Sequence, residues 1–135
     1  MASELKVDKF TGVTTAGSIL VTGEGNSTTT NLQQGLAKAW GNAPGDATSI
    51  NDSFNVASLT DTEAGDMTYN LTNNMSATEY SLTAGQQYTS VLGTGAFFDN
   101  PITGATSSFR MQHYENGSKV DAFKYSGGTI HGDLA

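Results

Sequence analysis

Two histidines, His113 and His131, are the side chains that could act as a general base in this chain. A serine or threonine nucleophile needs such a base beside it, and a third group that orients the base. In the segment SFRMQHY, Phe109, Met111 and His113 are each two residues apart, so the three share one face of a strand. His131 lies in a glycine-flanked tail. The pattern therefore predicts a core or interface role for His113, and it does not predict a serine–histidine hydrolase or any other enzyme.

Three carboxylates, Asp61, Glu63 and Asp66, are concentrated in the segment TDTEAGD. Calcium prefers oxygen ligands, but it takes about six to eight of them in a shaped loop, and this segment lacks the spacing of an EF-hand. We therefore predict a solvated acidic turn, while the sequence leaves calcium binding at Asp61–Asp66 open. The segment GTGAFF is glycine-rich but has no lysine and no following helix, so it is not a phosphate loop. No catalytic, cofactor-binding or metal-binding residue is predicted.

The overall composition excludes several classes of protein. Only 14% of the residues are charged, the net charge is -7, and the six Lys and Arg residues are scattered. Binding of nucleic acid by phosphate neutralisation is therefore not expected. No apolar run approaches the roughly 20 residues that span a bilayer, so membrane insertion is not expected. The N-terminus MASELKVDKF lacks the apolar region of a signal peptide, so Sec export is not expected either.

Residues 1–34 are predicted to form an extended N-terminal arm. Apolar and charged residues alternate in ELKVDKF, which predicts a short strand, and GSILVTG is a second short apolar run. The following GEGNSTTTN has nothing to bury and is typical of a connector. Two short strands cannot form a stable core alone, so the arm needs its own body, sister subunits or another protein as a partner. The predicted assembly residues are Leu5, Val7, Phe10, Ile19, Leu20, Val21, Leu32 and Leu36.

The segment TNLQQGLAKAW, from Thr30 to Trp40, fits two patterns. Leu32, Leu36 and Trp40 have helical spacing, whereas the residues from Gly35 to Trp40 alternate as in a strand. We predict that Thr30–Gln34 joins the arm to the body, with room for one helical turn. The first strand of the body then begins at Gly35, and Trp40 is predicted to be buried.

Residues 35–135 are predicted to form an all-β body, a jelly-roll-like antiparallel β-sandwich of about seven or eight short strands. Asp52–Thr60 and Asp66–Thr72 are predicted to form a hairpin. The Asn116–Gly117 pair predicts a second hairpin turn, and the tail SGGTIHGDLA predicts a short edge strand. The predicted core residues are Trp40, Phe54, Val56, Met67, Tyr69, Leu71, Tyr80, Leu82, Phe109 and Met111.

Several segments, in their order and spacing, resemble the small β-domains of tailed-phage virion proteins, which are often tail-fibre or structural proteins of marine phages. The matching segments are Leu5–Lys9, Gly35–Trp40, Asp52–Asp61, Gly65–Met75 and Tyr80. The resemblance implies a non-enzymatic virion surface component, commonly trimeric, without a cofactor. Assembly in the host bacterial cytoplasm agrees with the absence of cysteine, because that compartment is reducing.

Three functions remain open at this point. The first is a host-attachment appendage whose loops Asn42–Ser49 and Gly93–Thr106 touch a bacterial surface glycan or protein. The second is a capsid decoration or head-fibre protein whose arm, Glu4–Val21, adds strands to a neighbour or to the capsid lattice. The third is a secreted carbohydrate-binding module, which is disfavoured by the N-terminus and by the single tryptophan. The candidate receptor-contact residues are Phe97, Phe98, Asp99 and Asn100.

Overall fold

The computed structural model describes residues 4–13, 19–22, 28–88, 96–97, 105–115, 118–121 and 123–135. In these ranges the protein consists of short antiparallel strands and a single helical turn. The predicted all-β antiparallel sandwich is thereby confirmed. The chain divides into two compact units, Met1–Leu36 and Ala37–Ala135. The boundary lies two residues after the predicted one.

The N-terminal unit contains one two-stranded sheet, in which β1 (Leu20–Thr22) pairs antiparallel with β2 (Thr29–Asn31). The helical turn α1 (Leu32–Gly35) follows β2 directly. It overlaps the junction Thr30–Gln34, where the sequence allowed one helical turn. The strand predicted in ELKVDKF is wrong, because residues 4–13 contain no strand. An alternating segment becomes a strand only when a neighbour accepts its backbone hydrogen bonds, and no described strand pairs with this one.

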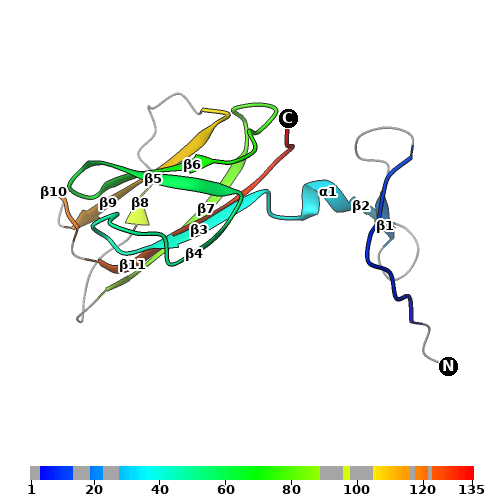
Figure 1. Cartoon of the computed structure of the whole chain (residues 1–135), viewed down its shortest axis with the longest axis horizontal. Helices are drawn as coiled ribbons and strands as arrows, with labels where there is room; N and C mark the ends of the chain where they lie inside the picture. The colour runs from blue at the N-terminus through cyan, green and yellow to red at the C-terminus, as the bar shows by residue number, and fades with distance from the viewer. Residues whose placement is uncertain are drawn as a thin grey trace. The chain divides into compact units, whose positions relative to one another are not determined.

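The body contains two antiparallel sheets that face each other (Figure 1). The five-stranded sheet has the order β10-β9-β6-β5, with β8 also paired to β9. The four-stranded sheet has the order β4-β3-β11-β7. The strands of the body are β3 (Ala39–Ala43), β4 (Asp52–Phe54), β5 (Val56–Glu63), β6 (Asp66–Leu71), β7 (Ser81–Tyr88), β8 (Ala96–Phe97), β9 (Ser108–Glu115), β10 (Ser118–Lys119) and β11 (Phe123–His131).

Large side chains of one sheet pack against small residues of the other. The rings of Tyr69 and Phe109 stack with centroids 4.7 Å apart and planes 4° apart. Opposite them lie Gly41 and Gly128, which are paired across β3 and β11; a Cβ on Gly41 would be 2.5 Å from the Tyr69 ring. The two sheets can approach closely only because these positions have no side chain. The buried apolar residues are Ala39, Ala43, Met67, Tyr69, Leu71, Met75, Phe109, Met111 and Ile130.

A corner at Asn55 divides the first strand of the predicted hairpin. Asn55 has a φ of 57°, a left-handed conformation that asparagine tolerates better than most residues. Its side chain accepts a hydrogen bond from the Asn73 N–H at 2.7 Å and donates one to the Asn73 carbonyl at 3.0 Å. The corner sends β4 to one sheet and β5 to the other. Phe54, predicted in the core, is therefore 51% exposed, while Val56 packs against the core.

The predicted burial of Trp40 in the core is also wrong. Ala39, Gly41 and Ala43 take the inward positions of β3, and Trp40 is only half-buried. Its Cα pairs with that of Phe54 in β4. The space in the core decides which residues of β3 point inward, because the stacked rings on the facing sheet leave no room for an indole. Trp40 therefore projects from the outer face of the four-stranded sheet.

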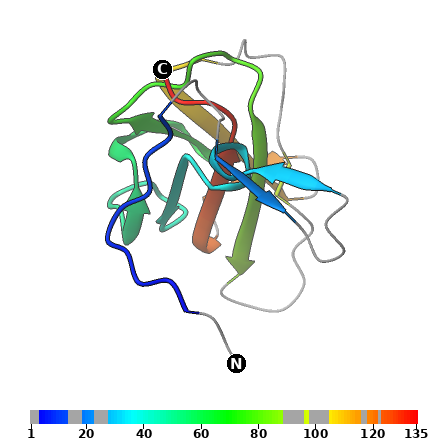
Figure 2. The same ribbon diagram turned by 90° about the vertical axis from the view of Figure 1, so that its right-hand side faces the viewer.

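The C-terminal tail forms a central strand and not the predicted edge strand. β11 lies between β3 and β7 in the four-stranded sheet, and Figure 2 shows its red and orange ribbon beside the green β7. Leu82 in β7 and the preceding Tyr80, both predicted in the core, are half-buried and pack against it. β10 pairs with β9 on either side of residues 116–117, which lie outside the described residues.

Candidate functional site

A buried serine–histidine pair lies between the two sheets. His113 in β9 and Ser126 in β11 are 0% and 1% exposed, and Nε2 of the histidine lies 2.6 Å from Oγ of the serine. The Tyr69 hydroxyl donates to the Ser126 carbonyl at 3.2 Å. His113 shares its buried face with Phe109 and Met111, so its predicted core role is confirmed. Since both side chains are sealed in the core, the serine hydroxyl is not presented to a substrate.

The burial of His113 makes the stability of the body pH-dependent. Burial lowers the pKa of His113 below its ordinary value of 6.5, although the Gly65 backbone and the charges of Asp121 and Asp66 oppose this shift. The unfolded chain then binds more protons than the folded chain near and below pH 6.5. We expect the contribution of neutral His113 to the free energy of unfolding to be fully present above this pH and to be lost as the pH falls below it. Urea denaturation between pH 8 and pH 5 measures this change.

The control for this experiment is His131→Gln, because His131 is the other histidine of the chain. The pH-dependent loss of stability should persist in this variant. A flat profile over the same pH range in both proteins would contradict the assignment to His113.

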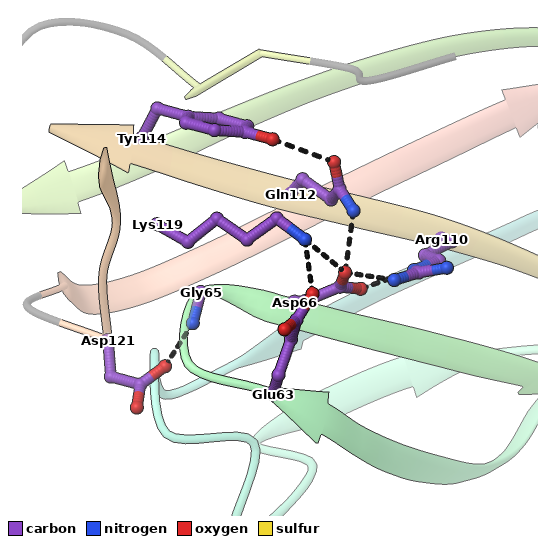
Figure 3. Close-up of polar contacts among 8 residues, drawn as sticks. All are labelled: Glu63, Gly65, Asp66, Arg110, Gln112, Tyr114, Lys119 and Asp121. Carbon is purple, nitrogen blue, oxygen red and sulfur yellow. Dashed lines mark hydrogen bonds and ion pairs between the residues drawn. The ribbon is translucent and has the colours of Figure 1, made fainter. Parts of the chain in front are cut away.

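A second polar cluster is centred on Asp66 at the start of β6 (Figure 3). Arg110 donates from Nε and Nη2 to the two carboxylate oxygens. Gln112 Nε2 donates to Oδ2 at 2.6 Å, and Lys119 Nζ donates to the same oxygen at 3.2 Å. Asp66 is 2% exposed, so the prediction of a solvated acidic turn is wrong for this residue. The cost of removing the Asp66 carboxylate from water is offset by the hydrogen bonds that it accepts from two cations and an amide.

The same cluster holds the turn between β5 and β6 against β9 and β10. Lys119 also donates to Glu63, and the Gly65 N–H donates to Asp121 Oδ1 at 2.5 Å. In Figure 3, Arg110 and Lys119 reach Asp66 from opposite sides. The cluster therefore joins groups that are distant in the sequence, and it acts as a structural clamp.

The electrostatics of the clamp agree with this role. Burial by itself raises the pKa of Asp66, but hydrogen bonds from Arg110, Gln112 and Lys119, with the charge of Arg110, bring it below its usual value. The hydrogen bond to Glu63 is the main reason that the pKa of Lys119 is raised. The Asp66 carboxylate thus stays ionised and occupied at neutral pH. Among the described residues, no group of three or more His, Cys, Asp or Glu side chains could hold a metal ion.

The predicted assembly residues of the N-terminal unit are mostly exposed. Leu5 is 73% exposed and Phe10 is 62% exposed; Val13, which was not among the predicted residues, is 95% exposed. Ile19 and Leu32 are half-buried, and the Leu32 N–H donates to the Ile19 carbonyl at 2.9 Å. The exposed large apolar residues of this unit are Leu5, Val7, Phe10, Val13, Leu20, Val21 and Leu36. We call these seven residues the apolar arm surface.

The predicted receptor-contact residues fall largely outside the described ranges. Phe97 lies in β8, where its Cα pairs with that of Gln112 in β9. Phe98, Asp99 and Asn100 lie outside the described residues.

Comparisons of the chain with family models, with curated proteins and with solved structures give no match. In the part of the chain that the structure describes, no helix has the length and apolarity of a membrane span.

Proposed function

We propose that this protein is a non-enzymatic structural component of a tailed-phage virion, anchored by its N-terminal unit and displaying its β-sandwich body. The observation that carries the proposal is the unequal placement of apolar side chains in the two units. Seven of the ten large apolar residues that are exposed in the described ranges lie in the N-terminal unit. In the described part of the body, by contrast, nine apolar residues are buried together in a core.

An exposed apolar surface of this kind indicates a partner. A two-stranded sheet is marginally stable by itself in water, and a short unit that leaves seven large apolar side chains exposed is suited to binding a partner. The residues in 4–13 also alternate in charge, with Lys6 Nζ lying 3.5 Å from Glu4 Oε1. Polar and apolar groups are thus both available to a neighbouring chain. This anatomy is that of a part that is anchored at one end and displays the other.

The favoured form is a short trimeric appendage of the tail-fibre or spike type, in which the arms of three copies pack together and the body contacts the host. The alternative is a capsid decoration or head-fibre protein, in which the arm binds the capsid lattice. Among the described residues, no further strand pairs with β1 or β2, which suits strand addition in the alternative form. Quantitative mass spectrometry of virions that contain the protein separates the two forms. A few copies to tens of copies per particle support a tail appendage, and hundreds support the capsid.

The arm surface gives a direct test in solution. The double variant Phe10→Ser/Val13→Ser is expected to convert a trimeric full-length chain to monomer, because both side chains are exposed in the N-terminal unit. Light scattering coupled to size-exclusion chromatography measures the mass, and thermal unfolding of the body should be unchanged.

The matched control is Leu134→Ser, which removes an exposed apolar side chain, 42% exposed, from the body. It should leave the mass unchanged. A wild-type chain that is monomeric at high concentration would contradict the trimeric appendage, and an unchanged mass in the double variant would contradict the role of the arm.

A further inference from the structure

The outer face of the four-stranded sheet carries aromatic side chains that the core does not use. Trp40 in β3 and Phe54 in β4 are paired across the two strands, and both project from this face. Phe54 is 51% exposed, and Tyr125 in β11 is 37% exposed. In the described part of the body, the third large exposed apolar residue is Leu134. Two of the three therefore lie on one sheet face, which is typical of a binding surface.

The same face has a floor of glycine. Gly127 in β11 pairs with Gly85 in β7, and both occupy outward positions. A Cβ on Gly85 would meet no atom within 4 Å, and Gly65 is the described glycine that has a positive φ. Neither packing nor backbone conformation therefore demands glycine at position 85. Its effect is to leave open space on β7 and β11 next to Asn42, which pairs with Gly127, while Phe54 lies on the opposite edge strand of the same face.

Polar groups border this floor. A Cβ on Gly127 would lie 3.4 Å from Asn42 Nδ2, so the amide of Asn42 stands next to the glycine. Asn51 Nδ2 donates to Asn42 Oδ1 at 2.9 Å, which fixes the orientation of that amide. Asp52 is exposed and pairs with Asn42 across β3 and β4. The face therefore offers a fixed amide and a carboxylate within one strand pair of the two aromatic rings.

This combination selects a polyhydroxylated ligand with flat apolar faces. Aromatic rings supply rigid apolar contact area, while amide and carboxylate groups accept and donate several hydrogen bonds in fixed directions. Residues 37–135 contain ten acidic and four basic side chains, a net charge of -6, so a polyanion would be repelled. Pyranose rings present C–H groups on one face and hydroxyls at the edge, which fits both requirements.

We infer that the outer face of the four-stranded sheet binds a neutral oligosaccharide. Its pyranose rings lie on Trp40 and Phe54 and over the glycine floor, and its hydroxyls bond Asn42 and Asp52. The inference deepens the display role proposed above by giving the body a ligand and a face. It rests on that proposal only for its biological setting. The variants of the N-terminal unit test the anchoring, and the variants of the body test ligand binding on this sheet face.

The test uses the full-length chain and three probes: cellohexaose, maltohexaose and chitohexaose. Trp40 is the single tryptophan of the chain, so its fluorescence reports directly on this face, and calorimetry gives the Kd. We expect a saturable change with at least one probe. Phe54→Ser and Gly85→Val should each raise the Kd at least tenfold. Gly85→Val fills the open floor without lowering the melting temperature, because nothing lies near the added side chain.

The control is Ala57→Val, which places the same valine side chain at an exposed position of β5 in the other sheet; its Kd should equal that of the wild type. The inference is overturned when none of the three probes gives a saturable change, or when Phe54→Ser and Gly85→Val bind as the wild type does. A change of molecular mass in Phe54→Ser would also overturn it, because the face would then be a contact between copies of the chain.

Discussion

Replacement of Tyr69 by alanine is expected to lower the free energy of unfolding of the body by about 4 kcal/mol, as for other large aromatic truncations in a core. Tyr69 is 0% exposed, its ring stacks on Phe109, and its hydroxyl donates to the Ser126 carbonyl. The variant therefore loses contacts with both sheets and leaves a cavity over Gly41. Guanidinium denaturation followed by circular dichroism at pH 7 measures the loss.

The variant Tyr69→Phe separates the ring from the hydroxyl. It keeps the stack and removes one buried hydrogen bond of 3.2 Å, so a loss of about 1 kcal/mol is expected. Burial raises the pKa of Tyr69 to about 12, and the hydroxyl is therefore protonated and able to donate at neutral pH. Equal losses in the two variants would contradict the packing role that we assign to the ring.

Gly65→Ala should be the most damaging single-methyl change in the body, with a loss of about 3 kcal/mol. The φ of Gly65 is 68°, and a non-glycine residue in a sparsely populated region costs about 1–3 kcal/mol. The new Cβ would also lie 2.5 Å from the Val120 nitrogen and 2.7 Å from the His113 oxygen. Overpacking adds about 1–3 kcal/mol, and these neighbours are backbone atoms that cannot rotate away. Chemical denaturation at pH 7 measures this loss.

Gly85→Ala is the matched control for this prediction, because a Cβ at that position meets nothing within 4 Å. It should unfold at the same denaturant concentration as the wild type. If Gly65→Ala were as stable as Gly85→Ala, the close approach of the β5–β6 turn to Val120 would be wrong. The clamp at Asp66 would then also be in question, because the Gly65 N–H is bonded to Asp121.

Two strands could be predicted from the sequence in detail. Alternation placed Met67, Tyr69 and Leu71 on one face of β6, and Phe109 and Met111 on one face of β9, and all five are buried. These strands are half-buried, and a local period of two then marks the inward face directly. The separate character of the N-terminal segment was also readable from its composition, and the boundary differs by two residues.

Alternation of apolar residues did not predict the inward faces of β3 and β4, because it does not say which sheet a strand joins. Phe54 and Val56 alternate with polar residues in DSFNVASL, yet the left-handed Asn55 divides this segment between two sheets. In β3, Trp40 and Ala39 are equally compatible with alternation, and the stacked rings on the opposite sheet decide which one points inward. As a result, Trp40 and Phe54, both predicted in the core, project from the outer face of the four-stranded sheet.

The Asp66 clamp and the central position of β11 could not be read from neighbouring residues. Arg110 and Lys119 are 44 and 53 residues from Asp66, and no local pattern links them. The sequence by itself determined an all-β chain, a distinct N-terminal segment with short apolar runs, and the inward faces of β6 and β9. Tertiary structure alone decided strand neighbours, the outward aromatic face and the buried ion pairs. The reason is that periodicity is local, whereas sheet pairing, space in the core and charge neutralisation are set by residues far apart in the chain.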